Sequence, residues 1–244
     1  MKQVNQVFPH KKYGDDMPLL GLEWCRPISN REAKEKIARG VARRASSGDI
    51  IGAGSGSTSF LTVLALGERV AKERLDLIII PSSLEIELAC NAVGLNVCKV
   101  VPSYISWCFD GADEVDPLGR LIKGRGGALY QERLVFTAAR NRVVVADNSK
   151  TVDRLGRNFP VPVEVEPAWV QSVYVHLNQL DHVSNVRLRM GVAKDGPVIT
   201  ESGRLLLDVT MSQIDEADEE LLLSISGLCC TGIFSGFDFE RISE

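Results

Sequence analysis

A dense run of charged residues, FDGADEVDPLGRLIKGRGGALYQE at positions 109–132, contains most of the candidate chemistry of this chain. Asp110 and Asp113 stand at the end of an apolar stretch that is typical of a buried strand. Ligands of open α/β sheets bind at the carboxyl ends of the strands, so both carboxylates could face a cleft. There they could give protons to a bound ligand or take protons from it. The alternative is a hairpin with acidic turn residues, and we favour that interpretation for Glu114 and Asp116.

A lysine, a glycine-rich loop and a glutamate follow directly. Lys123 ends a short returning strand. Gly124, Arg125 and Gly126 then begin a loop whose backbone N–H groups could approach an oxyanion. Glu132 lies on a predicted helix beside apolar neighbours. A carboxylate on a helix that borders a small cleft suits a general base, and an exposed helix glutamate without a function is the alternative.

A second glycine-rich segment, IIGAGSGSTSF at positions 50–60, predicts an anion site. A buried strand leads through glycines into a helix, and the N-terminal N–H groups and dipole of a helix favour a negative charge. Ser55, Ser57 and Thr58 add hydroxyl donors, which makes phosphate the expected ligand. The segment lacks the Lys-Ser/Thr ending of a Walker A loop, and a tight turn with capping hydroxyls is the alternative.

The composition excludes several classes of function. The chain has 244 residues and a net charge of −4, which gives no reason to expect a nucleic-acid or membrane partner. Its longest apolar run, near positions 77–80, is far too short to span a bilayer, and the N-terminus lacks the apolar core of a secretory signal. Six scattered cysteines indicate reduced thiols, and three histidines form no metal-ligand pattern. We therefore expect a cytoplasmic protein without a metal site.

Alternating strand and helix patterns over 30–156 predict an α/β domain, with a mostly parallel, Rossmann-like sheet and helices on both faces. The first helix is expected to begin with a capping box at 29–32. Later in the domain, one helix is expected over 127–141 and a strand over 142–147. Residues 1–29 are then an N-terminal extension.

A change of pattern after Gly156 predicts a smaller α+β, ferredoxin-like domain over 157–232. Its two helices are expected at 168–180 and 216–225. The last apolar segment, FDFERI, is expected to return to the first sheet, so 233–244 are assigned to the first domain. The strands expected in the second domain are at 159–167, 186–191, 197–200 and 204–210.

Taken together, these motifs resemble the type A family of ribose-5-phosphate isomerases. GAGSGSTS is similar to that family's phosphate loop, and DGADEVDP and LIKGRGGAL are similar to its two central motifs. VVVADNSKTVDRLG and FPVPVEVEP resemble its later signature, and GPVITESGRLLLD resembles its second domain. Several ordered motifs over about residues 30–242 are much more specific than any single one.

The resemblance implies an aldose–ketose isomerase of the pentose phosphate pathway, which interconverts D-ribose 5-phosphate and D-ribulose 5-phosphate through a cis-enediolate. Glu132 matches the family's base. Asp110 and Lys123 match residues that handle the sugar hydroxyls, open the ring and stabilise the oxyanion, with Asp113 beside them. No metal or cofactor is implied, and a homo-oligomer, dimer or tetramer, is expected. The implied substrate-binding positions are Lys34, Ser55, Gly56, Ser57, Thr58, Gly111, Ala112, Gly124, Arg125, Gly126 and Lys150.

Some positions depart from the family pattern, and two other functions are open alternatives. Arg125 replaces a glycine, and we expect its side chain to point away from the cleft. The alternative is an inward side chain that clamps the substrate phosphate or pairs with Asp110 or Asp113. Tyr130 and Gln131 replace a small hydroxyl residue and a charged one. A non-enzymatic sugar-phosphate sensor of the DeoR effector-domain type would have no use for Glu132 with Lys123, and no room for a helix-turn-helix domain is expected before the first helix. A coenzyme A transferase-like fold normally needs a longer chain.

Overall fold

The computed structural model of this chain describes Trp24 and residues 27–243. Most of the expected N-terminal extension at 1–29, with His10, therefore lies outside the described residues. Among the helices that the structure describes, none combines the length and the apolar character needed to cross a membrane.

The main sheet has six strands, β1 (Ile50–Ala53), β2 (Ile78–Pro81), β3 (Asn96–Val97), β4 (Ile105–Gly111), β7 (Ala139–Val145) and β13 (Glu240–Ile242). Their order is β13-β7-β4-β1-β2-β3, and every neighbouring pair is parallel. The predicted mostly parallel sheet is therefore confirmed. The last strand returns to this sheet, as expected, by pairing with β7.

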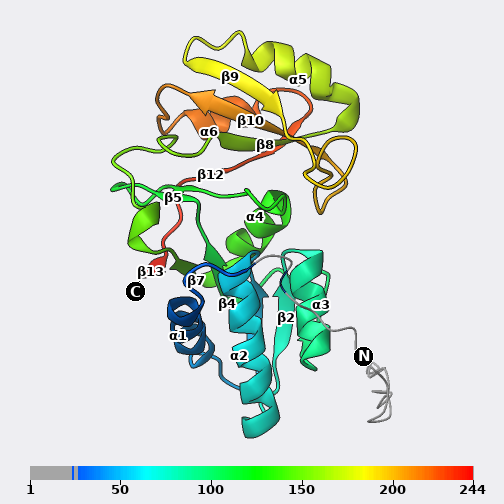
Figure 1. Ribbon diagram of the computed structural model, residues 1–244, viewed down its shortest axis with the longest axis vertical. Coiled ribbons are helices and arrows are strands. Elements are labelled where there is room, and N and C mark those ends of the chain that lie inside the picture. The colour runs from blue at the N-terminus through cyan, green and yellow to red at the C-terminus, as the bar shows by residue number, and fades with distance from the viewer. Residues whose placement is uncertain (1–23, 25–26, 244) are drawn as a thin grey trace, which may run out of the picture.

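The helices that cover this sheet are α1 (Arg31–Ala42), α2 (Ser57–Glu73), α3 (Leu84–Ala92) and α4 (Leu129–Ala138). Alternate residues of a strand point to opposite faces of its sheet. In β2, Ile79 belongs to the apolar cluster of α1, α2 and α3, whereas Ile80 belongs to the cluster of α4. Three helices thus cover one face and α4 covers the other, as predicted (Figure 1).

The second structural unit consists of β8 (Val161–Val165), α5 (Val170–Leu177), β9 (Val183–Leu188), β10 (Leu205–Met211), α6 (Asp218–Leu223) and β11 (Leu228–Thr231). The strand order is β11-β8-β10-β9, with antiparallel neighbours, so this βαββαβ unit is ferredoxin-like as predicted. The sequence analysis missed β11, and the strand expected at 197–200 is wrong because only isolated bridges form there. The proposed domain boundaries stay predictions.

A small antiparallel sheet lies between the two units (Figure 1). It contains β5 (Glu114–Val115), β6 (Leu121–Ile122) and β12 (Ile233–Phe234), in the order β12-β6-β5. Strands β5 and β6 form the hairpin expected in this acidic segment. Its acidic residues are buried, however: Asp116 forms an ion pair with Arg120, with a distance of 2.7 Å between Oδ2 and Nη2.

Two helix ends differ from the sequence-based prediction for local reasons. The capping box expected at 29–32 is wrong, because Asn30 is the N-cap of α1 in a left-handed conformation and its side chain caps nothing. Ser29 instead accepts a hydrogen bond from the ammonium of Lys34, at 3.1 Å. Helix α4 ends before 141 because the chain already pairs with β4 from Ala139 onward.

We expect Glu114→Gln to destabilise the fold. The Glu114 carboxylate is fully buried and accepts hydrogen bonds from the backbone N–H groups of Gly156 (2.7 Å), Asn158 (2.5 Å) and Phe159 (3.0 Å). An amide keeps only one acceptor oxygen and places an NH₂ group against these donors, at a cost of about 1–3 kcal/mol. Urea unfolding measures this cost, with Glu216→Gln at an exposed position as the control. Equal stability of the two variants would contradict this role.

Candidate active site

The expected acid–base residues meet in one buried cluster at the carboxyl end of the main sheet. Lys123 follows β6, and its ammonium lies 2.8 Å from Asp110 Oδ2 on β4 and 3.3 Å from Glu132 Oε2 on α4. The same ammonium donates a hydrogen bond to the carbonyl of Gly111, at 2.6 Å. All three charged side chains are almost completely buried, so water screens their interactions little.

Burial and mutual charge set the protonation of this cluster. Burial raises the pKa of Asp110 to about 7; the Lys123 ammonium opposes this rise and the Glu132 carboxylate adds to it. Burial acts to lower the pKa of Lys123, but the carboxylates of Asp110 and Glu132 outweigh burial, and the pKa of Lys123 is raised. Lys123 is therefore charged at neutral pH, whereas Asp110 can take up or release a proton there.

Glu132 connects the charged cluster to the glycine-rich loop after β1. Its Oε1 accepts a hydrogen bond from the Ser55 hydroxyl, at 2.6 Å. Its Oε2 is buried and accepts no hydrogen bond from the described residues. Gly56 caps α2 with a φ of 88°, a conformation that favours glycine, and Ser57 and Thr58 lie in the first turn of the helix. Hydroxyl groups and the positive end of a helix dipole are thus presented together, which suits an anion.

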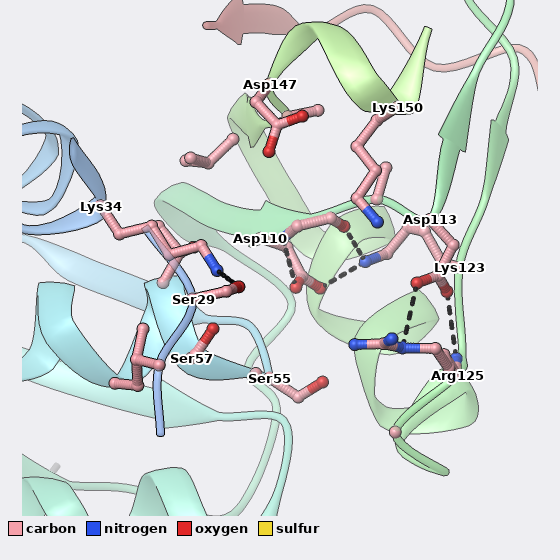
Figure 2. Close-up of a pocket in the computed structure, with 18 of the residues that line it drawn as sticks. Ser29, Lys34, Ser55, Ser57, Asp110, Asp113, Lys123, Arg125, Asp147 and Lys150 are labelled. Carbon is pink, nitrogen blue, oxygen red and sulfur yellow. Dashed lines mark hydrogen bonds and ion pairs between the residues drawn. The ribbon is translucent and has the colours of Figure 1, made fainter. Parts of the chain in front are cut away.

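Every catalytic and substrate-binding residue expected from the sequence lines a single cavity of about 540 Å³. Figure 2 shows Ser55 and Ser57 on one side of it and Asp113, Lys123 and Arg125 on the other, with Asp110 between them. Segments that are far apart in the sequence, from α1 to the turn after β7, therefore contribute to one site.

Two lysines from separate elements also line the cavity. Lys34 is on α1, and Lys150 ends a short 3₁₀ turn (Asn148–Lys150) after β7. Asp147 also lines the cavity and was not predicted. A hydrogen bond from Ser149 holds the pKa of Asp147 below its usual range, and Lys150 and Lys34 act in the same direction. Asp147 follows β7, and Asp110 lies within the last residues of β4, so both are at the carboxyl edge of the main sheet and the rule on strand ends could have identified Asp147.

Arg125 lies at the mouth of the cavity, so the expected outward orientation of its side chain is wrong. Its Nε is 3.5 Å from Asp113 Oδ1, and its backbone N–H donates to Asp113 Oδ2 at 3.2 Å (Figure 2). Burial raises the pKa of Asp113, while Lys123 and Arg125 oppose this rise. The glycine loop turns back over the Asp113 carboxylate, which attracts the guanidinium although the Arg125 side chain remains 71% exposed.

Sequence reasoning also missed Gly54 and Trp24. A Cβ atom on Gly54 would lie 2.0 Å from Cγ of Asp110, so only glycine leaves room for that carboxylate. Gly54 belongs to the glycine-rich segment, and such a run of glycines indicates that another group approaches the backbone closely. Trp24 lines the cavity and packs against Phe60, with ring centroids 5.2 Å apart, and no local pattern indicated this. Within the described residues, no group of His, Cys, Asp and Glu is arranged to hold a metal ion.

A buried carboxylate beside a buried ammonium, in one cavity with a helix N-terminus that suits an anion, is typical of an enzyme that moves protons on a small phosphorylated substrate. Comparison with known proteins agrees. The family model of ribose 5-phosphate isomerase A (phosphoriboisomerase A) matches residues 78–242. A ribose-5-phosphate isomerase A of Trichormus variabilis is 40% identical over 82% of this chain and 86% of its own length. One of Methanothermobacter thermautotrophicus is 39% identical over 78% of this chain and 83% of its own.

Solved structures give the same result. Ribose 5-phosphate isomerase A of Methanocaldococcus jannaschii is 35% identical with a TM-score of 0.82, and the match covers 88% of this chain and 95% of that one. A D-ribose-5-phosphate isomerase in complex with phospho-erythronic acid is 33% identical with a TM-score of 0.83 and the same coverage. The chain belongs to the ribose 5-phosphate isomerase A family.

We expect the stability difference between wild type and Asp110→Asn to depend on pH. The pKa of Asp110 is about 7 in the folded chain, against an ordinary value of about 3.9 in an unfolded one, so the folded chain binds this proton more tightly. The stabilisation is present below about pH 4 and is lost as pH rises toward 7. The wild type should therefore lose up to a few kcal/mol relative to the variant, at about 1.4 kcal/mol per pKa unit.

Urea unfolding at several pH values between 4 and 8 measures this difference. Asp195→Asn, at an exposed position, is the control and should follow the wild type at every pH. A difference that grows in favour of the wild type as pH rises would show that Lys123 keeps Asp110 ionised in the folded chain.

Proposed function

We propose that this chain interconverts D-ribose 5-phosphate and D-ribulose 5-phosphate, and that Glu132 is the base that moves the proton between C2 and C1. The observation that carries the assignment is the buried Oε2 of Glu132, which accepts no hydrogen bond from the described residues and lies 3.3 Å from the Lys123 ammonium. Such an oxygen has a lone pair available for a C–H proton, and the ammonium beside it stabilises the charge that the substrate then carries.

The proposed reaction is a proton transfer within one substrate. Glu132 takes the C2 proton of the open-chain aldose, the C–H electron pair forms the C1–C2 double bond, and the carbonyl oxygen O1 becomes an oxyanion. The proton on O2 then moves to O1, the protonated Glu132 returns its proton to C1, and O2 becomes the ketone oxygen. One base on one face of the planar enediolate can serve both carbons. In the cis-enediolate that the resemblance implies, the two oxygens lie on the same side of the double bond, where Lys123 can stabilise both.

Asp110 is suited to the protons on oxygen. With a pKa of about 7 it can give a proton to the ring oxygen and accept one from a sugar hydroxyl at neutral pH. Asp113 lies beside it in the cavity and is held by the backbone N–H of Arg125. We assign ring opening to Asp110 and the positioning of the sugar hydroxyls to Asp113.

The phosphate group of the substrate is assigned to the loop that opens α2. Ser55, Gly56, Ser57 and Thr58 line the cavity at the N-terminus of this helix, and the helix has no acidic residue in its first turn. Lys34 and Lys150 line the same cavity and supply positive charge for an anionic substrate. With the phosphate at this loop, the carbon chain of the sugar extends toward Glu132, because Ser55 belongs to the loop and donates a hydrogen bond to Glu132.

The alternative of a non-enzymatic sugar-phosphate sensor has no support among the relatives, which carry the name of an isomerase. A binding protein also gains nothing from a buried carboxylate oxygen left without a hydrogen bond, because such an oxygen costs free energy. A homo-oligomer and a cytoplasmic location stay predictions.

We expect Glu132→Gln to abolish isomerisation while leaving ligand affinity within about tenfold. The amide keeps the size of the side chain but cannot accept a carbon-bound proton, and loss of a general base costs about 10²–10⁴ in rate. The assay is NMR detection of the C2 proton of ribose 5-phosphate exchanging with solvent. Glu68→Gln, at an exposed position on α2, is the control.

Affinity can be measured with phospho-erythronic acid, which one solved relative binds. Its carboxylate carries two coplanar oxygens and a negative charge, so it resembles the enediolate more closely than the sugar does. A Glu132→Gln protein that binds this acid but retains most of its turnover would show that another group is the base.

We expect Arg125→Gly to raise KM for ribose 5-phosphate by about three- to tenfold and to change kcat little. The guanidinium sits at the mouth of the cavity and is largely exposed, so it attracts the anionic substrate without reaching the buried cluster. Arg125→Gln, which removes the charge but adds no backbone freedom, should behave in the same way. A fall in kcat beyond about tenfold in both variants would mean that Arg125 contacts the reacting atoms.

A further inference from the structure

The glycine loop of the active site is held from outside the cavity by an arginine of the second unit. Arg189 directly follows β9, and its Nη1 donates hydrogen bonds to the carbonyl oxygens of Gly124, at 3.1 Å, and Arg125, at 2.9 Å. The carboxylate of Asp208 on β10 binds the other side of the guanidinium, with 2.9 Å from Nε to Oδ2 and a second bond from Nη2. Arg189 is not among the residues that line the cavity.

Peptide geometry links these two carbonyls to the cavity. The described chain has no cis peptide bond, so in each planar peptide unit the C=O and the following N–H point in opposite directions. Because both carbonyls face Arg189, the N–H groups of Arg125 and Gly126 face away from it. The N–H of Arg125 accordingly reaches Asp113, at 3.2 Å.

The N–H of Gly126 is the free member of this pair. It has no acceptor within the described residues, and Gly126 is exposed on the wall of the cavity. A Cβ atom on Gly126 would lie 3.4 Å from the hydroxyl oxygen of Ser55, which in turn binds Glu132. The free N–H therefore belongs to the part of the loop that faces the base.

We propose that Arg189, anchored by Asp208, is a positioning residue that orients the peptide units of the glycine loop, so that the Gly126 N–H stabilises the oxyanion of the enediolate. The proposal rests on the isomerase function proposed above. Arg189 brings no net charge to the substrate, because Asp208 neutralises it and neither side chain lines the cavity. Arg189 instead fixes the direction of the Gly126 N–H dipole. This dipole then needs no reorganisation when negative charge develops on the substrate.

A neighbouring contact holds the same loop from the same side. The carbonyl of Gly127 accepts a hydrogen bond from the backbone N–H of Glu201, at 3.2 Å, and Glu201 belongs to the same β9–β10 connection that Arg189 begins. The carbonyls of Gly124, Arg125 and Gly127 thus all bind donors of the second unit. The second unit orients the loop while the first unit carries the base.

The test compares Arg189→Met with Arg187→Met, an exposed arginine two positions earlier on β9. Four quantities are measured for each purified variant: kcat and KM for ribose 5-phosphate, the inhibition constant of phospho-erythronic acid, and the inhibition constant of inorganic phosphate. For Arg189→Met we expect kcat to fall about 10- to 100-fold, since loss of a full oxyanion donor costs about 10²–10³ and here the donor is only misplaced. KM should change less than about threefold.

The inhibitors separate positioning from a general loss of structure. Affinity for phospho-erythronic acid should fall by about the same factor as kcat, because its carboxylate uses the misplaced N–H, whereas affinity for inorganic phosphate should not change. Arg189→Lys should lose nearly as much kcat, because one ammonium cannot bind Asp208 and both carbonyls with the same geometry. Arg187→Met should match the wild type.

If Arg189→Met does not fold, Arg189→Lys and Asp208→Asn carry the test, because each must show the same parallel fall in kcat and in affinity for phospho-erythronic acid. Unchanged kcat in the Arg189 variants, or an equal loss of affinity for inorganic phosphate, would overturn the positioning role. A wild-type protein without isomerase activity would instead overturn the proposed function.

Discussion

The active site depends on one buried ammonium. Removing a charged side chain from water costs several kcal/mol unless the fold supplies partners, and Lys123 receives them from three directions. Asp110 lies at the end of β4 in the main sheet, and Glu132 lies on helix α4. The Gly111 carbonyl accepts a hydrogen bond from the same ammonium. The ammonium therefore connects the strand end, the helix and the returning hairpin.

The backbone of Lys123 ties this arrangement to the junction of the two units. Its N–H donates a hydrogen bond to the carbonyl of Gly232, at 2.9 Å, and Gly232 lies where the chain leaves the second unit. The N–H of Gly232 in turn donates to the carbonyl of Pro162, at 2.7 Å. A Cβ atom on Gly232 would lie 2.4 Å from the carbonyl oxygen of Lys123, so the crossing requires glycine. Arg133, next to the base, binds Glu219 of the second unit at 2.6 Å. The second unit is therefore part of the framework of the active site.

Sequence reasoning succeeded where function follows from the position of a residue on a single element. Asp110 was found because the carboxyl ends of strands in an open α/β sheet are where ligands bind. Lys123 was found because it follows a returning strand and directly precedes a glycine-rich loop. It failed where a contact joins distant segments. The Glu114 carboxylate binds a loop far along the chain, and Arg189 reaches the active-site loop from another sheet. No local pattern encodes such contacts, because each depends on how whole units pack.

The hydrogen bonds of the two buried carboxylates argue for different tasks. Asp110 uses both oxygens, one for its neighbouring backbone N–H at 2.7 Å and the other for Lys123 at 2.8 Å. Glu132 uses one oxygen for Ser55 and keeps the other without a hydrogen bond from the described residues. Taking a proton from carbon requires a desolvated lone pair aimed at the C–H bond, whereas protons on oxygen transfer readily along existing hydrogen bonds. This asymmetry favours Glu132 for the carbon-bound proton and Asp110 for the protons on oxygen.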